Sequence, residues 1–184
     1  MNPDSRIPGF HGPAAGFEAP LEMLAACHGR IERQCATLLR LAPHLAIHGA
    51  DAQARTAAAN VLRYFDTAAL QHHADEEVDL FPALLESMAG SDAVCIRDLT
   101  ERLGAEHRML EAAWQDLRGP LTKIAEGEAA SIPAAQLEAF ADLYASHLAL
   151  EDAELLPMAA RLLGDAQIES IGRAMRERRG IGTT

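Results

Sequence analysis

The chain has 184 residues and a net charge of −11 at pH 7, so it can form one domain with a substantial core, and neither nucleic acid nor a membrane is an expected partner. Hydrophobic residues make up 49% and aromatic residues only 4%, and β-branched residues do not fall in alternating runs, which favours an all-α protein. The sequence shows no signal-peptide pattern, no apolar run of about 18 residues, and no metal-finger spacing among Cys27, Cys35 and Cys95, so we expect a cytoplasmic protein with reduced thiols.

The first 19 residues differ in composition from the rest of the chain. Residues 1–19 contain three prolines and three glycines, which predicts an irregular N-terminal arm with a solvated His11. A first helix is expected from Pro20 to about Ala42, where Pro43 stops or kinks it. Its apolar seam has heptad-like spacing and comprises Leu21, Leu24, His28, Ile31, Cys35, Leu38 and Ala42.

A second helix is expected after Asp51, which is a suitable N-cap, and it should run to about Met88 with Gly90 beyond its end. Pro82 lies inside this span and predicts a kink in the last turns. The apolar stripe alternates steps of three and four and comprises Leu62, Phe65, Ala69, His72, Glu76, Leu80 and Leu84.

Two further long helices and a fifth amphipathic helix complete the chain. The third helix follows Ser91 and should be interrupted at Gly119-Pro120. Ser131 and Pro133 indicate the start of the fourth helix, which should end at Gly164. The fifth should run from Asp165 to about Arg179, with a basic end that complements the helix dipole. We therefore expect an N-terminal arm, one four-helix bundle, and a C-terminal helix with its tail, over residues 1–19, 20–163 and 164–184.

One phrase occurs twice. Glu76 follows His72 by four residues and Pro82 follows it by ten, and Glu151 and Pro157 follow His147 by the same intervals. Residues four apart share one face of a helix, and both pairs fall in the apolar stripe that should face the core. An unpaired ionised carboxylate in a core is strongly unfavourable, so something must compensate both glutamates.

Histidines are placed alike on all four bundle helices. Five of the eight histidines have a glutamate four residues later, where chance would give fewer than one. Facing helices of a bundle build metal sites from such side chains. Glu32 and Glu111 lie about one position off the seam, because Ile31 and Leu110 hold the inward slots. The seam histidines are His28, His72, His107 and His147.

Two central carboxylates flanked by four imidazoles would hold two divalent cations. Glu76 and Glu151 would bridge them; one cation would take His28 and His72, and the other His107 and His147 with Glu111 as a further ligand. His73 is the alternative to Glu111. Glu77 and Asp152 are expected outside the ligand shell or in solvent, although Asp152 could replace Glu151. Imidazole and carboxylate ligands without a thiolate suit iron or manganese, and zinc is a further possibility.

These residues resemble the hemerythrin-like, HHE cation-binding family over about residues 20–163. The resemblance is specific in the second and fourth helices and looser in the first and third. It implies an up-down-up-down antiparallel four-helix bundle with two iron ions joined by an oxo or hydroxo bridge. Glu111 stands where the oxygen-carrying hemerythrins have a histidine, and Glu151 follows His147 by four residues rather than five, a spacing that Asp152 preserves.

The leading functional hypothesis is a protein that binds or senses oxygen, nitric oxide or peroxide at a di-iron centre. The alternative is a di-iron enzyme for peroxide reduction, ferroxidase action or iron donation, in which Tyr144 could relay protons or a radical, although packing is its simpler role. A third reading is a structural bundle filled with zinc or manganese.

Overall fold

The computed structural model describes residues 16–87, 93–128 and 131–182, and within these ranges every regular element is a helix, as the composition predicted. The predicted features at His11, Gly90 and Ser91 lie outside the described residues. In chain order the elements are α1 (Pro20–His48), α2 (Ala52–Arg63), η1 (Tyr64–Ala68), α3 (Ala69–Ala74), η2 (Asp75–Leu80), α4 (Phe81–Glu86), α5 (Ala93–Glu126), α6 (Ala134–Leu150), η3 (Glu151–Leu155), α7 (Leu156–Leu162) and α8 (Asp165–Arg178), where η marks a π-helical turn.

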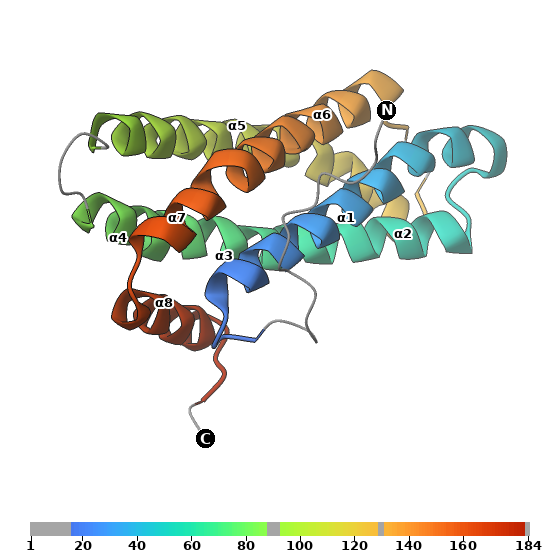
Figure 1. Cartoon of the computed structure of the whole chain (residues 1–184). Helices are drawn as coiled ribbons and strands as arrows, with labels where there is room; N and C mark the ends of the chain where they lie inside the picture. Colours follow the sequence, from blue (N-terminus) through green and yellow to red (C-terminus); the bar gives the residue numbers. More distant parts are fainter. Residues whose placement is uncertain (1–15, 88–92, 129–130, 183–184) are drawn as a thin grey trace, which may run out of the picture.

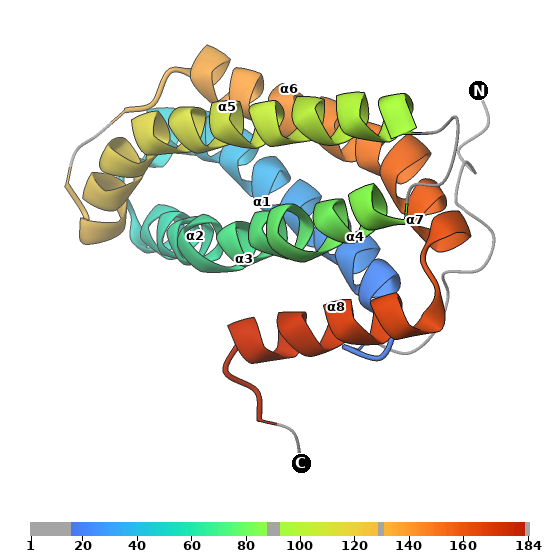
Figure 2. The same cartoon turned by 90° about the vertical axis from the view of Figure 1, so that its left-hand side faces the viewer.

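The helices form a bundle with α8 outside it (Figures 1 and 2). Elements α2 to α4 follow one another without a break and make one 52–86 helix, and α6 to α7 make one 134–162 helix. α1 packs against α2 and α6, while α5 packs against the same two neighbours. Across the described ranges, each helix is too short or too polar to cross a lipid bilayer.

Local signals fixed one helix start but misplaced two helix ends. The side chain of Asp51 accepts a hydrogen bond from the backbone N–H of Ala54 at 2.8 Å, which confirms the predicted N-cap. The stop predicted at Pro43 and the interruption at Gly119-Pro120 are wrong, because α1 and α5 run through both. Leu121 just beyond Pro120 is fully buried, so packing on the core outweighs the hydrogen bond that Pro120 removes.

Each repeated phrase contains a π-helical turn that ends two residues before its proline. The backbone N–H of Phe81 donates to the carbonyl of Glu76, and that of Leu156 donates to the carbonyl of Glu151, five residues back in both cases. A proline donates no such bond, and the wider turn rearranges the backbone bonding where the prolines follow. The two candidate bridging glutamates therefore lie in matching π turns.

The core consists of two apolar clusters at opposite ends of the bundle. On every bundle helix the candidate ligands lie between a residue of one cluster and a residue of the other. His28, for example, lies between Leu24 and Ile31, and His107 lies between Leu103 and Leu110. The four helices thus bring their histidines to one level along the bundle.

Candidate metal centre

Six of the seven predicted ligands converge in the bundle interior. Each of them is at most 3% exposed. Their nitrogen and oxygen atoms form two groups in which all the chosen atoms lie within 4.8 Å of one another: His28, His72, Glu76 and Glu151 in the first, and His107, His147, Glu76 and Glu151 in the second. The two glutamates belong to both groups, which is the arrangement of two cations that share two carboxylates.

The carboxylate oxygens are divided between the two groups. Glu76 Oε1 lies 3.6 Å from His72 Nε2, and its Oε2 lies 3.3 Å from His107 Nε2. Glu151 Oε2 lies 3.2 Å from His28 Nε2, and its Oε1 lies 3.0 Å from His147 Nε2. Each glutamate therefore presents one oxygen to each pair of histidines.

Most of the inward-facing atoms have no hydrogen-bond partner within the protein. Buried polar atoms are rarely left without one, because the loss of hydration is unfavourable. A cation fits this donor set, because it would pair with the nitrogen and oxygen lone pairs at once. The buried unpartnered atoms are His28 Nε2, His72 Nδ1 and Nε2, His73 Nε2, and both carboxylate oxygens of Glu76 and of Glu151.

Carboxylates outside the two groups accept hydrogen bonds from the Nδ1 atoms of three histidine rings. Asp152 Oδ1 accepts a hydrogen bond from His28 Nδ1 at 2.7 Å, and Glu77 Oε1 accepts one from His107 Nδ1 at 2.6 Å. Each of these acids directly follows one of the shared glutamates, so the two halves of the bundle use the same device. Such contacts fix the orientation of the ring and leave the second nitrogen for a metal. Asp152 is half-exposed and bonds the outer nitrogen, so Glu151, not Asp152, lies between the two groups.

A third outer carboxylate was not anticipated from the sequence. Glu106 Oε2 accepts a hydrogen bond from His147 Nδ1 at 3.0 Å. Glu106 directly precedes His107, and it reaches His147 on the neighbouring helix. Seam periodicity could not identify it, because the contact depends on how closely α5 and α6 pack.

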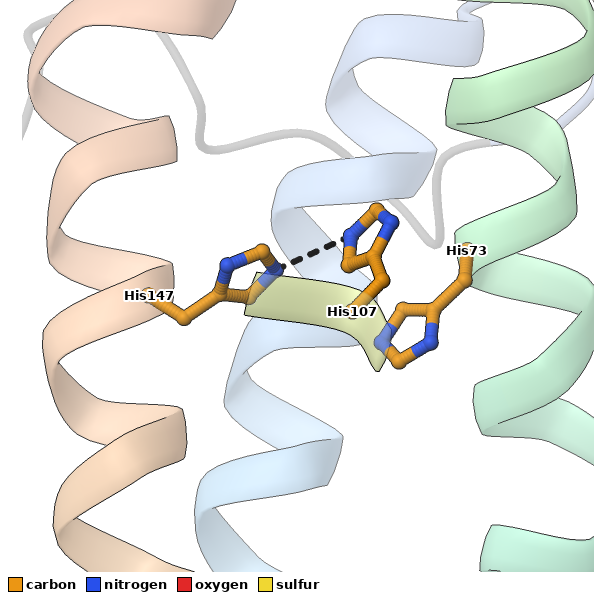
Figure 3. Close-up of side chains that lie close together, drawn as sticks. All are labelled: His73, His107 and His147. Atoms are coloured by element: carbon orange, nitrogen blue, oxygen red, sulfur yellow. Dashed lines mark hydrogen bonds between the residues drawn. The ribbon is translucent and has the colours of Figure 1, made fainter. Parts of the chain in front are cut away.

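His73, not Glu111, lies beside His107 and His147. Glu111 is exposed and belongs to none of the groups of ligand atoms found in the described ranges, whereas atoms of His73, His107 and His147 lie within 4.8 Å of one another. Figure 3 shows these three side chains converging from three helices, with His107 Nε2 and His147 Nε2 3.1 Å apart. Leu110 takes the inward position on α5 and directs Glu111 to solvent.

The carboxylates of the centre raise the pKa values of two of its histidines. Burial would lower the pKa of His28, but its bond to Asp152 and the adjacent Glu151 outweigh burial and raise the pKa to about 10. Burial is likewise outweighed at His107, where Glu151 and Glu76 raise the pKa to about 10. Two histidines are therefore positively charged at neutral pH in the metal-free fold.

The pKa values of the two shared glutamates are shifted in opposite directions. Burial and the charge of Glu151 raise the pKa of Glu76 to about 7. At Glu151 the three neighbouring imidazoles outweigh burial, so its pKa lies well below the usual range. Burial lowers the pKa of His72 to about 3, so this ring is neutral and ready to act as a ligand.

A cavity of about 280 Å³ reaches the centre on the side of His73 and His107. Phe65 and Trp114 lie along one part of its wall, and Tyr144 lies next to the histidines. The remaining lining residues are Ala69, Leu70, Ala74, Glu77, Val78, Arg108, Leu110 and Glu111. Solvent-sized molecules can thus reach His73 and His107 along a mostly apolar wall.

Comparison with known proteins agrees with this geometry. Residues 19–159 match the family model of the hemerythrin HHE cation binding domain. The chain is also 31% identical over 167 residues to a Haemophilus influenzae protein described as "Uncharacterized protein", and the alignment covers 91% of this chain and 94% of that protein. The family match includes every candidate ligand, and α8 lies beyond its end.

Proposed function

The chain belongs to the hemerythrin HHE cation-binding family, and from this premise we propose that it holds two iron ions and binds oxygen, nitric oxide or peroxide at them. The carrying observation is the convergence of the four carboxylate oxygens of Glu76 and Glu151 with the imidazoles around them, buried and mostly without a hydrogen-bond partner, at one level of the bundle. A purely structural core would fill this space with apolar side chains, which carry no desolvation penalty.

The proposed ligands follow from the two groups. One ion would be held by His28 and His72, the other by His107 and His147, and Glu76 and Glu151 would bridge them. His73 is the proposed further ligand of the second ion, in the place expected of Glu111. Bound iron would supply reversible one-electron chemistry and open coordination positions for a small molecule.

The choice of iron rests on the donor set. Imidazole and carboxylate donors without a thiolate suit iron and manganese, and zinc accepts them as well. An oxo or hydroxo bridge between the ions belongs to the same proposal, as do the up-down-up-down antiparallel topology and a cytoplasmic location. The topology is supported by the pairing of α1 with α2 and of α5 with α6 through short connections.

A small uncharged ligand fits the cavity that leads to His73 and His107. The wall is largely apolar, with aromatic rings from Phe65, Trp114 and Tyr144, so it favours an uncharged molecule over a charged substrate. Its volume of about 280 Å³ is at the lower end of ligand-binding cavities. The volume is large enough to admit a diatomic molecule or peroxide.

An enzyme is the second candidate, and Tyr144 is the observation that favours it. The Tyr144 side chain is buried, lines the cavity and lies 6.1 Å from His73 between ring centroids. Burial raises the pKa of its phenol well above the usual value, so the hydroxyl keeps its proton. A phenol that keeps its proton beside a redox site could donate a hydrogen bond to a bound peroxide.

Reconstitution with ferrous iron tests the proposal. Anaerobic titration should saturate at two ions per chain, and admission of oxygen or nitric oxide should then change the visible spectrum. A protein that binds two irons but shows no change with oxygen, nitric oxide or peroxide would contradict the ligand-binding function. Repeated turnover of peroxide would instead support the enzyme, because a binder saturates. Zinc that persists against excess iron would support a structural bundle.

A further inference from the structure

α8 contacts the helix that carries His72 and Glu76 through Arg178 and Arg179 at its C-terminal end. Arg179 donates to Asp75 from Nη2 at 2.6 Å and from Nη1 at 3.1 Å, and Arg178 Nη1 donates to the same carboxylate. Arg178 Nη2 also reaches Asp79 Oδ2 at 2.6 Å. Asp75 is completely buried, so guanidinium groups take the place of water at both of its oxygens.

Asp75 lies between two candidate ligands on the 52–86 helix. Its backbone N–H donates to the carbonyls of Gln71 and His72, and it is the first residue of η2, directly before Glu76. Its side chain points to α8 while that of Glu76 points to the centre. The two arginines therefore bind the outer side of this helix at Asp75, the residue directly before Glu76.

The contact is present on one half of the bundle only. When His72 is aligned with His147 by the repeat, Asp75 corresponds to Leu150. Leu150 packs against an apolar cluster and offers no charge to an arginine. α8, which is not part of the repeat, thus contacts the bundle at a position where the two copies of the repeat differ.

The backbone of α8 fits its place closely. A Cβ atom on Gly172 would lie 1.9 Å from the carbonyl oxygen of Phe17, so only glycine allows this approach. Ile171 and Met175 already supply a buried apolar face for docking. A buried ion pair adds little net stability over an apolar contact of the same size, so attachment alone does not explain the arginines.

We propose that Asp75, Arg178 and Arg179 are positioning residues of the metal centre, through which α8 fixes the π turn that carries Glu76 and so sets the affinity of the centre for both ions. This inference rests on the proposed metal site. It assigns a role to α8, which lies beyond the family match. From the sequence, the basic end of this helix was expected only to complement the helix dipole.

The test transfers the residue of the other half. Asp75→Leu places the residue found at position 150 and removes the carboxylate that Arg178 and Arg179 share, while Arg178 keeps its bond to Asp79. In the metal-free protein, we expect faster amide hydrogen exchange in residues 75–80 and unchanged exchange in residues 151–155, which serve as an internal reference. With zinc loaded and a coloured chelator added, both ions should leave faster by about tenfold or more, because Glu76 belongs to both groups of ligands.

Arg173→Met is the matched control, because Arg173 is exposed on the same helix and bonds only to Ser170 among the contacts described. It should leave exchange and zinc release unchanged. Arg178→Met with Arg179→Met should reproduce the Asp75→Leu effects. Wild-type exchange and release in Asp75→Leu, or equal acceleration in both π turns, would overturn the positioning role. A wild-type chain that binds neither zinc nor iron would instead contradict the metal site itself.

Discussion

Glu76→Gln should stabilise the metal-free protein while it removes metal binding. The pKa of Glu76 is raised from 4.5 to about 7, chiefly by burial. A carboxyl with a raised pKa favours folding below its unfolded pKa and loses that contribution as the pH rises through about 7. At about pH 8 the ionised group therefore destabilises the fold by about 3 kcal/mol.

Glutamine occupies the same volume and carries no charge at any pH. Its amide oxygen could accept from His107 and its nitrogen could donate to His72, the two rings that Glu76 faces at 3.3 and 3.6 Å. We expect the metal-free variant to gain up to about 3 kcal/mol, or about 6 to 12 °C in melting temperature, at about pH 8. The gain should shrink toward zero at about pH 5, where Glu76 itself is neutral.

Denaturant unfolding of chelator-treated protein at the two pH values measures this difference. Glu154→Gln is the control, because Glu154 lies at an exposed position of the matching π turn. Iron or zinc should stabilise the wild type and have little effect on Glu76→Gln. A metal-free variant that is less stable than the wild type at about pH 8, or that keeps two tightly bound ions, would refute the reasoning.

Three further outcomes are expected. His73→Ala should lower the affinity for the second ion by more than about tenfold, whereas Glu111→Ala should leave the affinity for both ions unchanged. A competition titration with a chelator measures both. Metal binding at about pH 7 should release protons, because His28 and His107 have pKa values of about 10 in the metal-free fold and must lose their protons to become ligands; calorimetry in two buffers of different ionisation enthalpy measures this, and apparent affinity should rise with pH. His72→Ala should reduce the metal content below two ions per chain, and elemental analysis checks it.

Helical periodicity was sufficient to predict the level and the orientation of most of the centre. His28, His72, His107 and His147 occupy seam positions on regular stretches of helix, where a side chain four residues away shares the same face. The buried charge also had to be compensated, so composition and spacing together indicated cations. These inferences depend on local geometry, which the sequence contains.

The differences arise where helices depart from 3.6 residues per turn. In the 52–86 helix Val61 is buried instead of the predicted Leu62, and Asp75, the first residue of the π turn η2, is buried beside Glu76. The straight-helix pattern predicted Glu111 as the further ligand, with His73 as its alternative. The role of α8 depends on a contact between residues about a hundred positions apart, which no local pattern encodes.

A crystal structure of the iron-loaded protein, with anomalous data at the iron edge, tests the metal centre most directly. We expect two anomalous peaks per chain inside the bundle, one beside His28 and His72 and the other beside His107 and His147, with Glu76 and Glu151 between them. A single peak, or peaks only on the protein surface, would contradict a two-metal site built from these residues.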